Sequence, residues 1–198
     1  MRRLFGRGMT GKPSRRGGLL RNRDGSAAVE FAMVAFPFFL MLFAIIEIAL
    51  ILTIDAVLEN AVIDTGRLVR TGQAAAMGMT PEQFKSQICS RMTVFAGDCE
   101  TRATIDVRVV TNFVISPQDD PLSSGVFDPT VPLTYSNGAP NSWMLVRVWY
   151  KHPLITGFLA QAVSRTTDGA AMLSAATAFK NEPPGGGQPV QPAPAATP

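Results

Sequence analysis

The sequence is poor in the residues that most often carry chemistry, with one histidine and two cysteines among 198 residues. These residue types supply most zinc ligands and many catalytic groups. The single histidine, His152, lies between a lysine and a proline, no serine occupies a nucleophile elbow, and no phosphate-binding loop is present. We therefore predict a protein that is not an enzyme and has no cofactor, in which His152 is a surface or packing residue.

Charge is absent from one stretch and unevenly divided over the rest. No charged residue occurs from Phe31 to Ile46. Before Gly25, eight basic residues face one acid, a charge of +7, whereas from Ser26 onward ten basic residues face fourteen acids, a charge of −4. Basic residues beside a hydrophobic segment stay on the cytoplasmic side of a membrane. Residues 1–25 are therefore predicted to be a disordered cytoplasmic leader. Nucleic acid is not an expected partner, because no stacking aromatic residues accompany these arginines.

Two glutamates bracket the uncharged run. The run covers about 24 Å as a helix, and the apolar residues on either side make it long enough to cross a hydrocarbon core of about 30 Å. Glu30 and Glu47 lie about 26 Å apart along that helix, so each can lie near one headgroup layer. For Glu47 we favour this interfacial position over a specific buried partner. Glu30 either is an interfacial carboxylate or pairs with an amino terminus created by cleavage before Ser26.

The glycine at the end of the leader suggests a processing site. The residues Ser14-Arg15-Arg16 faintly resemble a twin-arginine export signal. Such a signal, like a secretory peptide, has a short apolar core followed by a cleavage site. Here the apolar run is long, and the small residues precede it. We interpret the junction at Gly25 as a processing site in front of a membrane helix.

The helical pattern continues beyond the apolar run. Apolar side chains recur with a period of 3.6 residues up to Val69, and Gly72 is placed to end the helix. We predict a transmembrane and stalk helix over residues 26–72, about 68 Å long at its fullest extent. Pro37 removes one hydrogen bond and is expected to kink or loosen it.

The remainder predicts a small α+β head over residues 73–183, with an antiparallel sheet and short helices. Thr80-Pro81-Glu82 is typical of a helix start. The expected elements are a linker at 72–79, a helix at 81–92, a strand at 104–110, a long loop at 116–141, a strand at 143–151 paired with the first, a helix at 153–163, and at 170–179 a strand or a helix, of which we favour the strand. The Pro/Gly-rich residues 184–198 predict an unfolded tail.

Two features of the head have competing interpretations. Cys89 and Cys99 follow the apolar run, so they belong to an oxidising compartment if the basic leader stays inside the cell. A disulfide worth about 2–3 kcal/mol is favoured over two free thiols. Asp119, Asp120 and Asp128 lie in the long loop, but their spacing matches no EF-hand, so a solvated acidic loop is favoured over a calcium site.

The stretch Gly25-Ser-Ala-Ala-Val-Glu30-Phe31, preceded by Arg21-Asn-Arg-Asp24, resembles the start of the TadE-like family of pseudopilins, which belong to the tight-adherence (Tad, Flp) branch of type IV pilus systems. Later landmarks also look like the family's: Leu58–Gln73, the two cysteines, Ile105–Val109, Tyr150–Pro153 and Phe179–Pro183. The resemblance covers roughly residues 20–183 and says nothing of the tail.

The resemblance implies that a prepilin peptidase cuts between Gly25 and Ser26, with Glu30 and Phe31 as the glutamate and the aromatic residue of the processing signal. It implies a minor pilin or pseudopilin of the bacterial inner membrane, with a periplasmic head, that initiates, caps or regulates an adhesive pilus. Its expected partners are membrane lipid, the major pilin, other minor pilins and the inner-membrane platform. Glu30, Pro37 and Glu47 are the expected assembly residues. The alternative is an uncleaved single-span periplasmic scaffold or an anchored adhesin.

Overall fold

The computed structural model describes residues 24–111 and 120–183, so the leader before Asp24, Asp119 and the C-terminal tail lie outside the described residues. Its elements are α1 (Asp24–Arg70), α2 (Gln73–Ala76), α3 (Pro81–Arg91), the 3₁₀ turn η2 (Thr93–Phe95), α4 (Ala96–Arg102), β1 (Ala103–Val109), β2 (Trp143–His152), α5 (Gly157–Val163) and β3 (Ala171–Lys180). A long apolar N-terminal helix precedes a small domain with a three-stranded antiparallel sheet and short helices. The predicted α+β fold class is therefore confirmed.

The chain divides into two compact units, one ending at Leu42 and the other beginning at Phe43. In the first unit α1 is the one element among the described residues, and it continues through Pro37 without interruption. In the second unit, the remainder of α1 forms a core with the sheet and the short helices. Gly72, with a φ of +75°, follows the end of α1, and its backbone N–H bonds to the carbonyl of Val69 at 3.0 Å. A glycine adopts this left-handed conformation at little cost, which explains the predicted helix end.

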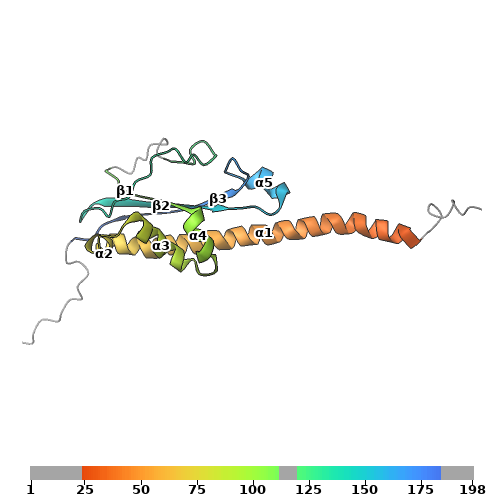
Figure 1. Ribbon diagram of the computed structural model, residues 1–198, viewed down its shortest axis with the longest axis horizontal. Coiled ribbons are helices and arrows are strands. Elements are labelled where there is room, and N and C mark those ends of the chain that lie inside the picture. Colours follow the sequence, from red (N-terminus) through yellow and green to blue (C-terminus); the bar gives the residue numbers. More distant parts are fainter. Residues whose placement is uncertain (1–23, 112–119, 184–198) are drawn as a thin grey trace, which may run out of the picture. The chain divides into compact units, whose positions relative to one another are not determined.

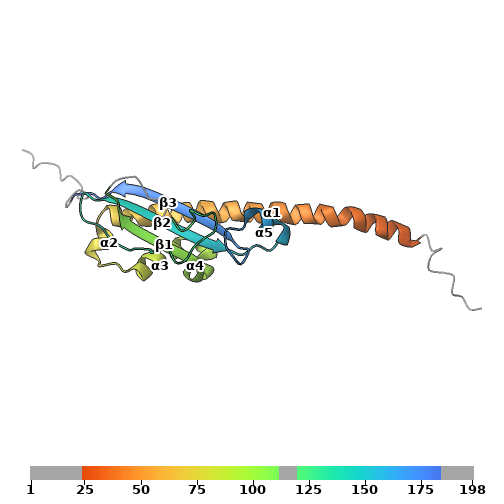
Figure 2. The same ribbon diagram turned by 90° about the horizontal axis from the view of Figure 1, so that it is seen from above.

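The sheet has the strand order β1-β2-β3, with both pairs antiparallel. Within the second unit, α1, α3 and α4 lie on one face of the sheet, and the segment after residue 120 crosses the other (Figure 1). The view from above shows the three strands running side by side over α1 (Figure 2). The alanine-rich segment at 170–179 is a strand, as favoured, because it pairs with β2 along its whole length, from Trp143↔Lys180 to His152↔Ala171. Pairing with a strong central strand outweighs the helix propensity of alanine.

Alternation along the strands determines which side chains form the core. Val146 and Val148 of β2 are completely buried, and they share a cluster with Leu58 and Val62 of α1. Gly66 allows α1 to approach β3 closely, because a Cβ there would lie 3.2 Å from side-chain atoms of Phe179 and Thr177. The helix therefore packs against the sheet through small and branched residues on one face.

The helix start at Thr80 is built as the sequence predicts. The Thr80 side chain accepts a hydrogen bond from the Gln83 backbone N–H, and the Gln83 side chain accepts one from the Thr80 N–H. This reciprocal capping box satisfies two donors at the helix end. The expected linker at 72–79 differs in detail, since it contains the single-turn helix α2.

Two further features were not predicted. The segment between Cys89 and Cys99 contains η2 and the start of α4, where no helix was predicted. Segment 134–136 lies along β1: the Val107 N–H bonds to the Thr134 carbonyl at 2.8 Å, and the Ser136 N–H bonds to the Val107 carbonyl at 2.9 Å. This part of the long loop therefore covers the edge of β1, which would otherwise expose unpaired backbone groups.

Candidate functional site

The residues of the predicted processing signal lie in the first turns of α1. Gly25, Ser26, Glu30 and Phe31 are all exposed. A Cβ added at Gly25 would meet no atom within 4 Å, and its φ lies outside the left-handed region. Neither packing nor backbone conformation within the described chain therefore requires a glycine at this position.

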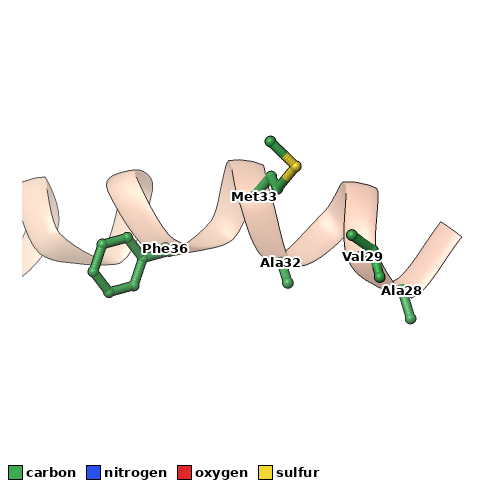
Figure 3. Close-up of a pocket in the computed structure, with 5 residues that line it drawn as sticks. All are labelled: Ala28, Val29, Ala32, Met33 and Phe36. Atoms are coloured by element: carbon green, nitrogen blue, oxygen red, sulfur yellow. The ribbon is translucent and has the colours of Figure 1, made fainter. Parts of the chain in front are cut away.

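The first unit presents an almost continuous apolar surface. Large side chains in this part of α1 are strongly exposed, among them Phe31 (72%), Met33 (74%) and Phe36 (72%). Figure 3 shows a shallow apolar depression lined by Ala28, Val29, Ala32, Met33 and Phe36, in which Ala28, Ala32 and Phe36 follow one side of the helix at intervals of four residues. Among the described residues, α1 is the one helix long and apolar enough to cross a membrane. Burial of this surface requires lipid or other helices, because no other described element of its unit covers it.

Glu30 stands out on this surface as an isolated charge. It is exposed, and the part of the chain that the structure describes gives it no hydrogen bond or ion pair. Neighbouring side chains on α1 are apolar over the following four turns. A partner for this carboxylate must therefore come from outside the described chain.

Glu47 has a different environment from the one expected. Its side chain is buried, with 4% exposure, and its carboxylate accepts hydrogen bonds from the backbone N–H groups of Ile155 and Thr156, the latter at 2.9 Å. Glu47 therefore has the specific buried partners that the sequence analysis disfavoured. The partners lie more than a hundred residues away in sequence, so the local pattern around Glu47 contained no sign of them.

The other face of the sheet holds a buried ionic cluster around Asp106. Arg108 bonds to both carboxylate oxygens, at 2.8 and 2.7 Å, Arg147 donates at 2.8 and 3.1 Å, and the backbone N–H of Thr134 donates at 2.9 Å. Burial alone raises the pKa of Asp106, but these hydrogen bonds outweigh it and hold the pKa below its usual value. Asp106 is fully buried because the loop after residue 120 covers this face, and the alternation along the strand alone did not predict that cover.

Three of the predicted head residues have structural roles. Cys89 and Cys99 form a disulfide that joins α3 to α4, which confirms the favoured interpretation over free thiols. His152 at the end of β2 is buried, and neither ring nitrogen has a hydrogen-bond partner. Burial first, and then nearby Arg102, lower its pKa, while Glu47 acts in the opposite direction. This environment favours a neutral, packed imidazole.

The carboxylates of the acidic loop accept hydrogen bonds from backbone groups close to them in sequence. Asp120 accepts a hydrogen bond from the Leu122 N–H at 3.0 Å, and Asp128 accepts one from the Thr130 N–H at 2.8 Å. Within residues 24–111 and 120–183, no three His, Cys, Asp or Glu side chains gather closely enough to hold a metal ion. Asp119 lies outside the described residues.

Comparison with known protein families gives a match within the N-terminal helix α1. Residues 25–67 match the family model described as TadE-like protein, a range that begins at Gly25 and lies within α1. No curated protein and no solved structure matches the chain. The match ends before the head, so the head is described by its structure alone. The resemblance to the TadE-like family that the sequence suggested is therefore confirmed over residues 25–67.

Proposed function

We propose that this protein is a non-catalytic minor pilin or pseudopilin that takes part in initiating, capping or regulating a Tad-type pilus. Its leader stays in the cytoplasm, α1 spans the inner membrane, and the head lies in the periplasm. A prepilin peptidase cuts between Gly25 and Ser26. The mature subunit then associates through α1 with the major pilin, other minor pilins and the inner-membrane platform.

The observation that carries the proposal is the match of residues 25–67 to the TadE-like family together with the exposed apolar surface of the same helix. A surface of this size is unstable in water. It suits a helix that first lies in lipid and then packs against other helices, where small residues such as Ala28 and Ala32 let backbones approach. Transfer from lipid to a helical bundle keeps the apolar side chains buried throughout.

The open surroundings of Gly25 support cleavage next to this residue. Gly25 lies in the first turn of α1, and no packing or backbone requirement within the described chain accounts for a glycine at this position. Recognition by a processing enzyme is an external reason for a small residue next to the cut. The glycine therefore fits the proposed substrate role better than a structural role.

Glu30 supplies the specific contact in this account. After cleavage, the new ammonium group at Ser26 of one subunit pairs with the Glu30 carboxylate of its neighbour, so that neither charge remains alone among apolar helices. An unpaired carboxylate inside a membrane costs about 3 kcal/mol, which favours pairing during assembly. The exposure of Glu30 and the lack of a partner within the described chain support this role.

The test is to replace Glu30 by Gln or Ala in the full-length protein and to measure membrane insertion and pilus assembly in the same cells. We expect normal insertion and greatly reduced piliation. The matched control is Glu59→Gln, which removes an exposed glutamate from the part of α1 that belongs to the second unit. Normal piliation by both Glu30 variants would contradict the proposed mechanism.

A further inference from the structure

The corner that joins β2 to β3 exposes two large apolar side chains. Ile155 is 86% exposed and Phe158, in α5, is 65% exposed, whereas the adjacent Leu159 is buried. No charged residue occurs from Pro153 to Ser164. The outer surface of this corner is therefore apolar and uncharged, which is uncommon for a loop and short helix in contact with water.

Hydrogen bonds join this corner to α1 next to the end of the uncharged run. The Glu47 carboxylate accepts hydrogen bonds from the Ile155 and Thr156 backbone N–H groups. Glu47 directly follows Ile46, the last residue of that run. Both ribbon views place α5 at this level along α1 (Figures 1 and 2). Ile155 thus lies at the level along α1 where the uncharged residues end.

Next to this corner, α1 also carries exposed apolar side chains, with Ile48 at 43% and Leu52 at 63% exposure. The part of α1 that belongs to the second unit therefore also presents apolar side chains to its surroundings near this corner. Two exposed side chains supply only part of the roughly 800 Å² that a standard protein interface buries on each side. A lipid surface imposes no such minimum area. A bilayer that α1 spans would lie close to this corner.

We propose that residues 153–163 enter the interfacial layer of the membrane that α1 spans, with Ile155 and Phe158 in contact with acyl chains. The contact keeps the head at a fixed distance from the bilayer until the subunit leaves the membrane during pilus assembly. The two backbone N–H groups at Glu47 keep its carboxylate hydrogen-bonded at this boundary, so the charge remains compatible with nearby lipid. The proposal rests on the membrane-spanning part of the proposed function.

The experiment uses the full-length protein in vesicles of phosphatidylethanolamine and phosphatidylglycerol, with the native disulfide intact. An environment-sensitive fluorophore is attached to a single added cysteine, in Ile155→Cys, Phe158→Cys, Leu40→Cys or Val94→Cys. Leu40 lies inside the uncharged run and reports on the span. Val94, in η2, is 85% exposed and is the matched control for an exposed hydrophobic residue elsewhere on the head.

The measured quantities are the emission maximum and the loss of emission caused by lipids brominated on their acyl chains. We expect blue-shifted, strongly quenched emission at positions 40, 155 and 158 and water-like, unquenched emission at position 94. Quenching at 40 with water-like emission at both 155 and 158 overturns this inference and leaves the span intact. Unquenched emission at 40 overturns the span itself and the inference with it. Equal quenching at 94 and 155 also overturns it, because contact would then not be specific to the corner.

Discussion

The carboxylate of Glu47 accepts a hydrogen bond of 2.9 Å from the backbone N–H of Thr156, a residue 109 positions later in the chain. Together with the bond from Ile155, this contact joins α1 to the corner before α5. It connects the helix that matches the TadE-like family to the head, which that match does not cover.

Replacing Glu47 by Gln should loosen this corner. The amide has one acceptor oxygen for two converging N–H donors, and its own NH₂ group faces one of them. We expect a loss of about 1–3 kcal/mol in the free energy of unfolding of the head. Urea unfolding in detergent, followed by the fluorescence of the buried Trp149, measures it. Glu59→Gln is the control, and an equal effect of both substitutions would show that the Glu47 contacts contribute nothing specific.

Replacing Asp106 by Asn should destabilise the head more strongly. Asp106 is fully buried, and its replacement by Asn removes the carboxylate charge that faces Arg108 and Arg147 and leaves one acceptor oxygen in place of two. We expect a cost of about 3–5 kcal/mol, as for breaking a buried ion pair. The control is Asp98→Asn, which removes an exposed 3.0 Å pair with Arg102 and should cost at most about 1 kcal/mol. Similar unfolding curves for the two variants would contradict a central role for the Asp106 cluster.

The buried His152 should make the head sensitive to mild acid. Its folded-state pKa lies below the ordinary value of 6.5, so between these values the unfolded chain binds more protons than the folded chain. Its contribution to stability is fully present above 6.5 and is lost as the pH falls through the lowered value. We expect the free energy of unfolding to decrease on acidification below 6.5.

The variant His152→Phe keeps an aromatic ring in this position and removes both unpartnered nitrogens. In this variant, the decrease attributable to His152 should disappear, while the acid sensitivity caused by Asp106 at lower pH remains. An unchanged pH dependence in the same window would rule out His152 as its source.

The sequence was sufficient where local patterns and secondary structure agree. The alternation at 104–110 and the aromatic and branched residues at 143–151 predicted β1 and β2, and the capping residues at Thr80 predicted the start of α3. The strand at 170–179 was harder to predict, because its alanines suit a helix in isolation. Its strand conformation depends on ladder partners in β2, which only the folded chain provides.

Three of the missed features depend on contacts between distant parts of the chain. The backbone partners of Glu47, the burial of Asp106 and the pairing of segment 134–136 with β1 join residues that are far apart in sequence. For Glu47 an interfacial position was favoured over a specific buried partner, since an isolated buried charge is very costly. Hydrogen bonds from distant groups remove that cost, and no local periodicity reveals them.

Processing next to Gly25 is tested by the mass of the mature amino terminus. Full-length protein is expressed in cells with and without a prepilin peptidase, isolated from membranes and analysed by mass spectrometry. A variant Gly25→Leu is included, because the described chain leaves open space at this position and should fold normally. The account predicts a chain that begins at Ser26 only when the peptidase is present and Gly25 is intact. A wild-type protein that begins at Met1 in cells with the peptidase would contradict the account and favour an uncleaved, membrane-anchored scaffold.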